Sequence, residues 1–262
     1  MTLTPDVIAQ LAEELAEADR THGVIPRITA RHPEATVEDS YAIQGVWRDR
    51  NLAAGRRLVG RKIGLTSRAM QQATGISEPD YGVMFDDTVY RSGADIPVAH
   101  FSNVRVEVEL AFVLAKSLEG PDASLRDALD AIEYAVPALE VLNSHIELEG
   151  RTIVDTIADN AAYGAMVLGD VRKTPDEVDL RWVPGVLSRN GEIEETGVAA
   201  GVLGHPATGV AWLANKFHQH GARLEAGEII LAGSFTRPMW VSQGDTVRCE
   251  FGPMGEITCR FV

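Results

Sequence analysis

Cysteine is scarce in this sequence, because only Cys249 and Cys259 occur among 262 residues. Their spacing does not match the Cys-x-x-Cys pattern of zinc or redox sites, so a site of that kind is excluded. Both lie in segments that read as neighbouring C-terminal strands. We therefore expect two thiols that belong to the hydrophobic core.

Positive charge and long apolar runs are also missing. The sequence holds 24 Lys and Arg against 38 Asp and Glu, which gives a formal net charge of −14. A nucleic-acid partner is not expected, because phosphate backbones require clustered cations. No segment reaches the roughly 18 uncharged apolar residues of a transmembrane helix. Residues 1–10 lack the basic and apolar stretches of a signal peptide, so we expect a cytoplasmic protein without a membrane partner.

Residues 1–57 read as a helical N-terminal lobe. A first helix is predicted over 4–20, with a proline at the first helical position, where it is tolerated. A second is predicted over 36–55, because Thr36-x-x-Asp39 matches a capping box. With 45% hydrophobic residues, the chain can bury a substantial core.

Residues 58–262 change to short strands and turns, and they read as one β-rich domain that is continuous with the lobe. Asn190-Gly191 predicts a hairpin over 187–193, because both residues accept positive φ angles. Two helices interrupt the strands, at 124–132 and 205–221. The predicted strands are 104–114, 134–142, 228–232, 246–251 and 256–262. The sequence therefore predicts an α+β fold.

Two glutamates share one face of a predicted strand. Apolar residues occupy the even positions of 104–114, so Arg105, Glu107 and Glu109 project from the opposite face. The next two residues on that face are apolar, so the glutamates point toward core. A third carboxylate, Glu140, interrupts the next apolar strand. Three buried oxygen ligands without histidine or cysteine favour a hard ion such as Mg²⁺, with paired salt bridges as the alternative.

Several other polar residues allow two interpretations. Lys62 is either a surface charge or part of a site that Gly64 opens to a ligand. Asp80-Tyr81 fits an ordinary turn as well as a binding site. Arg237 could bind a carboxylate through two hydrogen bonds or lie on the surface. The residues alone do not decide between these readings.

His205 and Asp159-Asn160 favour structural roles. Pro206 next to His205 already explains that position as the start of a helix, rather than as a catalytic base. Asp159-Asn160 is adequately explained as the cap of a turn. Neither residue pair indicates chemistry without further information.

The order of five motifs resembles the hydratase and decarboxylase family of aromatic meta-cleavage pathways, within the fumarylacetoacetate hydrolase superfamily. The motifs are residues 60–67 (G-R-K-I-G-L-T-S), 78–82 (E-P-D-Y-G), Glu107-x-Glu109, Pro137-x-Leu139-Glu140 and 158–161 (A-D-N-A). The segments 194–203, 209–216 and 233–238 resemble the hydratases of dicarboxylic acids within that family. Asn143-Ser144-His145 departs from the expected run, which affects local substrate contacts rather than the chemistry.

The resemblance implies a mixed β-roll or distorted barrel of the fumarylacetoacetate hydrolase type after the helical lobe. It implies a lyase that hydrates a 2-oxo-enoate dicarboxylic acid, with Mg²⁺, or alternatively Mn²⁺, on Glu107, Glu109 and Glu140. Lys62 and Asp80 would form the acid/base pair. Homo-oligomers, including decamers, are expected, as is association with a decarboxylase or aldolase of the same pathway.

Three substrate contacts are expected from the same comparison. Ser67 and Tyr81 would donate hydrogen bonds to the substrate, and Arg237 would bind its far carboxylate. The alternatives are a hydratase of the five-carbon monocarboxylate, a decarboxylase of the same fold, a C–C bond hydrolase and a noncatalytic partner subunit. The hydrolase would need a histidine–glutamate pair, and His205 is the one candidate near a motif.

Overall fold

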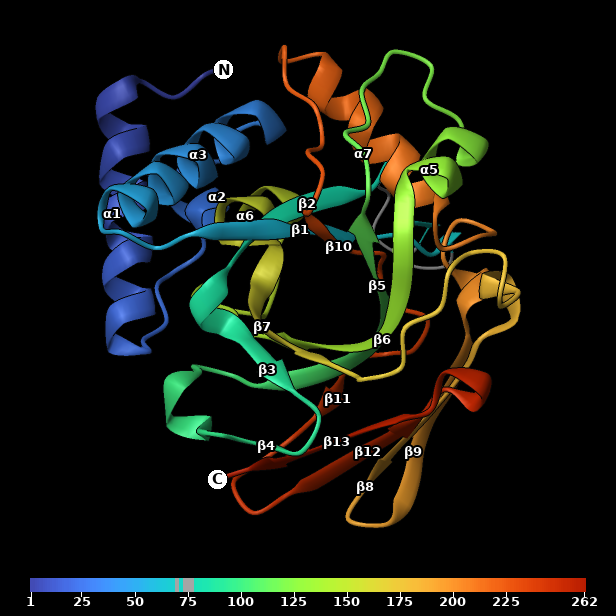
Figure 1. The fold of residues 1–262 in the computed structure, drawn as a ribbon. Helices are drawn as coiled ribbons and strands as arrows, with labels where there is room; N and C mark the ends of the chain where they lie inside the picture. The colour runs from blue at the N-terminus through green and yellow to red at the C-terminus, as the bar shows by residue number, and fades with distance from the viewer. Residues whose placement is uncertain (69–70, 73–77) are drawn as a thin grey trace.

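The computed structural model describes residues 1–68, 71–72 and 78–262, and it confirms the α+β class. Helices gather at one end of a β-rich body, and the N-terminus lies among them (Figure 1). The helices are α1 (Pro5–Thr21), α2 (Ile28–Arg31), α3 (Val37–Ala53), α5 (Leu125–Ala131), α6 (Ile153–Ala158) and α7 (Thr208–His218). Within the described part of the chain, no helix is both long enough and apolar enough to cross a membrane.

The strands form two sheets. The larger sheet has the order β2-β1-β10-β5-β6-β7-β3, with β11 also paired to β5, and its end strands do not pair to close a barrel among the described residues. Its strands are β1 (Leu58–Gly64), β2 (Asp80–Phe85), β3 (Val89–Arg91), β5 (Arg105–Leu114), β6 (Ile132–Leu142), β7 (Tyr163–Leu168), β10 (Ile229–Leu231) and β11 (Met239–Trp240). This sheet carries the long strands on which the glutamates lie.

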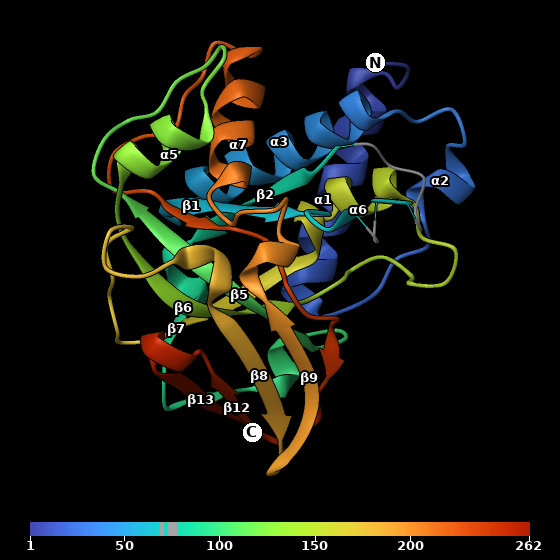
Figure 2. The same ribbon diagram turned by 90° about the vertical axis from the view of Figure 1, so that its right-hand side faces the viewer.

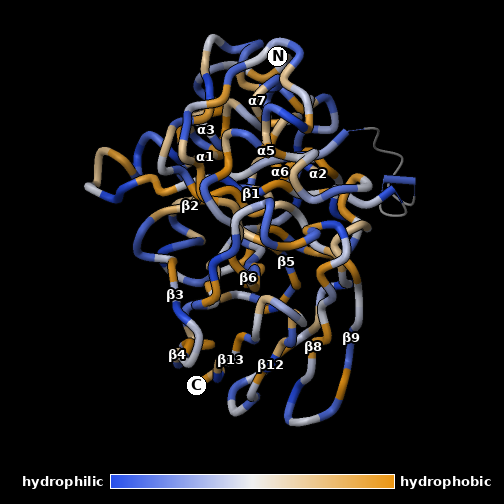
Figure 3. Tube along the Cα trace, turned by 45° about the vertical axis from the view of Figure 1, so that its right-hand side comes forward, coloured by the Kyte–Doolittle hydropathy of each residue, from blue (hydrophilic) through white to orange (hydrophobic). Residues whose placement is uncertain are grey.

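The smaller sheet has the order β4-β13-β12-β8-β9 and packs below the larger one (Figures 1 and 2). Its strands are β4 (Ala94–Ile96), β8 (Pro184–Arg189), β9 (Glu192–Val198), β12 (Thr246–Glu250) and β13 (Glu256–Phe261). Hydrophobic and hydrophilic residues alternate along β12, as Figure 3 shows, and the apolar ones are buried. Cys249 of β12 and Cys259 of β13 are both buried, as predicted.

Local signals explain most of the predicted elements. Thr4 caps α1 by accepting the N–H of Val7, and the capping boxes at the starts of α3 and α5 are both formed. Asn190 and Gly191 both have positive φ angles in the β8–β9 turn, which confirms the hairpin. The prediction for α7 was wrong at its start, because the helix begins at Thr208 rather than beside His205.

The helical lobe packs on the outer face of the large sheet. Leu11, Ile43 and Trp47 form a cluster with Phe85 of β2, and the rings of Trp47 and Phe85 meet edge to face at 5.8 Å. On another side, α5 and α7 lie side by side above the sheet (Figures 1 and 2). Because these helices pack on the outside of the large sheet, its inner face is left for polar residues.

Candidate metal centre and active site

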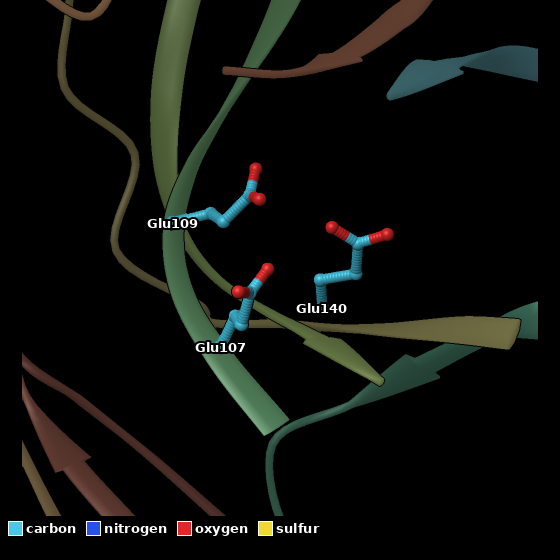
Figure 4. Close-up of side chains that lie close together, drawn as sticks. All are labelled: Glu107, Glu109 and Glu140. Carbon is cyan, nitrogen blue, oxygen red and sulfur yellow. The ribbon is translucent and has the colours of Figure 1, made fainter. Parts of the chain in front are cut away.

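The pairing of β5 with β6 brings the three glutamates together. Glu107 lies directly opposite Glu140 across the two strands, and Glu109 is the next residue on the same face of β5. Figure 4 shows the three carboxylates directed toward one another. One oxygen from each lies within 4.8 Å of the others, which is a suitable spacing for a single cation. The predicted cluster therefore exists as a spatial group.

Among the described residues, Glu109 and Glu140 have fewer hydrogen-bond donors than buried acids usually have. Glu140 is 0% exposed, and neither of its oxygens accepts a hydrogen bond of regular geometry from the described residues. Glu109 accepts one, from the backbone N–H of Gly233 at 2.8 Å, and its other oxygen has none. Because an unsatisfied buried carboxylate is costly, this donor set fits a divalent cation with oxygen ligands.

Burial raises the pKa of all three acids, and the charge of Glu140 adds to the rise for Glu107 and Glu109. Burial, followed by the charge of Glu140, raises the pKa of Glu107 to about 7. The same two causes raise the pKa of Glu109 well above its usual range. Burial likewise raises the pKa of Glu140, although Lys62 opposes that rise. The cluster thus needs positive charge to stay ionised.

Lys62 supplies part of that positive charge from β1. Its ammonium nitrogen lies 3.2 Å from Oε1 of Glu140 and donates a hydrogen bond to the carbonyl oxygen of Ala161 at 3.0 Å. The residue is only 4% exposed. Burial alone would lower its pKa, but the charges of Glu140 and Asp80 outweigh burial and raise the pKa. Lys62 is therefore a buried ammonium at the cluster and not a surface charge.

Asp80 lies beside Lys62 because β1 and β2 pair with Gly64 opposite Asp80. A Cβ atom on Gly64 would lie 2.1 Å from Oδ1 of Asp80 and 3.3 Å from the Lys62 nitrogen. Gly64 thus leaves room for the side chain of Asp80, whereas the sequence analysis had suggested that it leaves room for a ligand. Burial raises the pKa of Asp80, and Lys62 partly counteracts this effect.

An unusual turn holds the carbonyl that contacts Lys62. Asn160, Ala161 and Ala162 all have positive φ angles, between 48° and 60°. Asn160 ties the turn to β2 by accepting the N–H of Val83 at 2.8 Å and donating to its carbonyl at 2.9 Å. Left-handed backbone is unfavourable for alanine, so these contacts must hold the turn in place. The A-D-N-A motif therefore does more than cap a turn, because its backbone carbonyl holds the side chain of Lys62.

A cavity of about 940 Å³ opens onto this group. Lys62, Glu107, Glu109 and Ser67 line it, together with Arg237 near its outer part. The side chain of Arg237 is 82% exposed and forms an ion pair with Glu195 at 2.8 Å. Arg237 is thus exposed and already paired, whereas Glu109 and Glu140 are buried.

The structure does not bring Tyr81 or His205 into this cavity. Tyr81 follows Asp80 in β2, so its ring points to the other face, where it stacks on Tyr41 at 4.4 Å and meets Phe217 edge to face at 5.1 Å. His205 accepts the N–H of Ala207 on Nδ1, in a turn before α7. Both side chains therefore have structural partners away from the glutamates.

Sequence reasoning missed a second polar group behind the turn. Buried His145 donates its backbone N–H to Asp159 at 2.6 Å, and its ring Nδ1 lies 2.9 Å from the same carboxylate. Burial alone would lower the pKa of His145, but Asp159 outweighs it and raises the pKa. The unusual run Asn143-Ser144-His145 was the only signal, and it did not indicate a partner 14 residues away.

Comparison with known proteins gives consistent results. A family model described as "Fumarylacetoacetate (FAA) hydrolase C-terminal" matches residues 49–262. The chain is 51% identical to a 2-oxo-hept-4-ene-1,7-dioate hydratase of Escherichia coli, over 96% of this chain and 97% of that protein. It is 38% identical to a 2-keto-4-pentenoate hydratase of Paraburkholderia xenovorans, over 99% and 96%. The solved 4-oxalocrotonate decarboxylase from Pseudomonas putida G7, complexed with magnesium and adipate, aligns with a TM-score of 0.97 at 34% identity, covering 100% of this chain and 99% of that one.

Proposed function

Since this chain belongs to the fumarylacetoacetate hydrolase family, we propose that it is a metal-dependent hydratase of 2-oxo-hept-4-ene-1,7-dioate, which it takes up as the 2-hydroxy-2,4-dienoate tautomer. The product would be 4-hydroxy-2-oxoheptanedioate, formed in the breakdown of homoprotocatechuate. The observation that carries the proposal is the cluster of three glutamates, two of them buried, beside Lys62 and Asp80. The high identity to a hydratase of this substrate supports the same assignment.

Glu107, Glu109 and Glu140 would hold the metal ion, for which we propose Mg²⁺, with Mn²⁺ as an alternative. When bound, a divalent ion polarises the 2-oxo group and stabilises negative charge on its oxygen. This assignment is supported by the oxygens of Glu109 and Glu140 that accept no hydrogen bond of regular geometry from the described residues. The magnesium in the decarboxylase of similar fold supports the choice of ion.

Lys62 and Asp80 would carry out the proton transfers. The 2-hydroxyl group loses a proton while C5 gains one, which leaves a double bond between C3 and C4 in conjugation with the 2-oxo group. Water then bonds to C4, and C3 takes up the second proton. Both side chains are buried beside the glutamates, where charged neighbours adjust their proton affinity. Ser67 lines the same cavity and would orient the substrate.

The far carboxylate of a dicarboxylic substrate also needs a cation. Arg237 at the outer part of the cavity is the candidate from the sequence, but it would have to give up its ion pair with Glu195. Tyr81 was expected to contact the substrate and is left out of the proposed contacts, because its ring packs on Tyr41 and Phe217.

We also propose that residues 1–57 and 58–262 act as one structural unit in the cytoplasm. The chain would assemble into a homo-oligomer such as a decamer and associate with a decarboxylase or aldolase of the same pathway. The continuous pairing of β1, which follows the lobe, with β2 and β10 supports a single unit. Light scattering of the purified chain would measure the assembly.

The test of the activity is the loss of ultraviolet absorbance of 2-hydroxyhepta-2,4-diene-1,7-dioate, with and without a chelator. Fast loss that the chelator abolishes, without release of carbon dioxide, is the expected result. Release of carbon dioxide would instead identify a decarboxylase, which the similar fold of 4-oxalocrotonate decarboxylase makes the second candidate. Preference for the five-carbon monocarboxylate would move the substrate assignment to the pentenoate hydratases.

A further inference from the structure

Arg105 extends the row of charged side chains on β5. It lies on the same face as Glu107, one step nearer the start of the strand. The residue is buried, and its guanidinium donates one hydrogen bond, from Nη2 to the hydroxyl of Ser144 at 3.2 Å. Its Nε atom has no hydrogen-bond partner among the described residues. One face of the guanidinium lies over the ring of Trp240 at 5.2 Å.

A second arginine reaches the same hydroxyl from another part of the chain. Arg151 follows the loop after β6, and its Nη1 also donates to Ser144 Oγ. The negative charges of Asp159, Asp80 and Asp155 act on it. Two guanidinium groups therefore converge on one neutral acceptor beside the acid/base pair.

Neither guanidinium has a carboxylate partner. Across residues 1–68, 71–72 and 78–262, no ion pair within 4.0 Å involves Arg105 or Arg151. Several exposed arginines of this chain, by contrast, form ion pairs, as Arg260 does with Asp95 at 2.7 Å. Arg105 is buried and Arg151 is half-buried, and the positive charge of Arg151 acts on Arg105. An anion placed between the two guanidinium groups would relieve this repulsion between like charges.

We infer that Arg105, Arg151 and Ser144 form the subsite that binds the far carboxylate of the substrate. Successive residues on one face of a strand are roughly 7 Å apart, so the pair lies about that far from the Glu107 end of the cluster. A chain of five carbon–carbon bonds, each about 1.5 Å long, spans this distance from the 2-oxo carbon to the far carboxylate. This inference rests on the proposed function. It replaces Arg237 by one buried and one half-buried arginine, neither of which forms an ion pair within 4.0 Å among the described residues.

Two saturated analogues that cannot be hydrated provide the test. They are 2-oxoheptanedioate and 2-oxoheptanoate, which differ only in the far carboxylate, and their Kd values are measured by calorimetry in saturating Mg²⁺. The full chain should bind the diacid roughly 10- to 100-fold more tightly, because hydrogen bonds to charged groups are strong. Arg151→Gln should abolish this preference and leave the Kd of the monoacid unchanged.

Matched variants keep the test decisive. Arg126→Gln changes an arginine whose side chain is 88% exposed, and it should keep the full preference. Arg151→Lys retains the charge but not the two-point geometry, so it should keep part of the preference, and it carries the test if Arg151→Gln does not fold.

Three results would overturn the inference. Equal weakening of both ligands in Arg151→Gln would show that the pair serves the shared 2-oxo acid end. Loss of the preference in Arg237→Gln would place the far carboxylate at the outer part of the cavity. If the wild-type chain bound neither analogue with Mg²⁺ present, the proposed function itself would fail, and the inference with it.

Discussion

Buried acids in the two parts of the molecule have opposite surroundings. In the helical lobe, Asp39 is fully buried and accepts backbone N–H groups of Thr2, Leu3 and Thr36, together with two hydroxyls. In the large sheet, Glu140 is equally buried, yet its oxygens accept no regular hydrogen bond from the described residues. The difference separates a structural carboxylate, which has its donors built in, from one whose oxygens are left for a cation.

The pKa shifts follow the same division. Burial by itself would raise the pKa of Asp39, but hydrogen bonds from Thr36 and Thr2 outweigh burial and lower the pKa well below its usual range. For Glu107, burial and the charge of Glu140 act in the same direction, and the pKa rises. The lobe therefore stabilises its negative charge by itself, whereas the sheet depends on an added cation.

The largest effect is expected for Lys62→Ala. Loss of a proton-transfer group should lower turnover by about 10²- to 10⁴-fold. Metal affinity should not fall, because Glu140 would lose its protein cation and keep its need for one. Steady-state kinetics and Mg²⁺ titration would measure both quantities, with exposed Lys116→Ala as the control. Loss of metal binding in Lys62→Ala would contradict this division of roles.

Glu107→Gln should act on the metal first. Removing even an indirect partner of a metal ligand costs about 10- to 100-fold in affinity, so removing a ligand should raise the Mg²⁺ requirement at least that much. Without metal, the variant should be no less stable than the wild type, because it relieves repulsion with Glu140. Activity against Mg²⁺ concentration and unfolding with a chelator would measure these effects. An unchanged Mg²⁺ requirement would count against the cluster.

Asp39→Ala should lower the stability of the fold and leave the Mg²⁺ requirement unchanged, which is the reverse of the effect expected for Glu107→Gln. It removes the capping interaction of α3 and leaves several donors without an acceptor, so we expect a loss of about 2–4 kcal/mol in unfolding free energy. Mg²⁺ affinity should not change. Urea unfolding would measure the loss, and Asp130→Ala, at an exposed helical position, is the control. A change in Mg²⁺ affinity would break the contrast between lobe and sheet.

The smallest effect concerns acid pH. The pKa of Asp39 is lower in the folded chain than in the unfolded one. Its contribution is therefore complete above the unfolded value of about 3.9 and is lost as the pH falls toward the folded value. The stability difference between the wild type and Asp39→Asn should narrow as the pH drops from about 5 to 3. A difference that stays constant would argue against the lowered pKa.

Periodicity was enough to find the three glutamates of the cluster. Alternation along β5 put Glu107 and Glu109 on one face, and Glu140 was conspicuous as the charge in an apolar strand; the pairing of β5 with β6 then brought them together. Lys62 and Asp80 could be singled out only through the family resemblance. Their local sequence fits a surface strand and a turn equally well, and their burial depends on strands far apart in the chain.

Other parts of the site required three-dimensional information. Consecutive strand residues face opposite ways, so Asp80 and Tyr81 cannot both lie beside Lys62, but no signal had assigned 80–85 to a strand. Arg105 and Arg151 are separated by 46 residues and meet only because both reach Ser144. Such convergence depends on tertiary contacts, which no short sequence pattern encodes.

The contact between Lys62 and Ala161 bears on how the protein tolerates mutation. The acceptor is a main-chain carbonyl, so every amino acid at position 161 would supply it, and no change of that side chain can delete it. A mutation at position 161 can disrupt only the shape of the turn, because the residue there must adopt a positive φ angle. In a saturation library, position 161 should therefore accept glycine and asparagine and reject valine and isoleucine. The requirement to hold Lys62 would thus restrict the residues tolerated at position 161, although the side chain there takes no part in the chemistry.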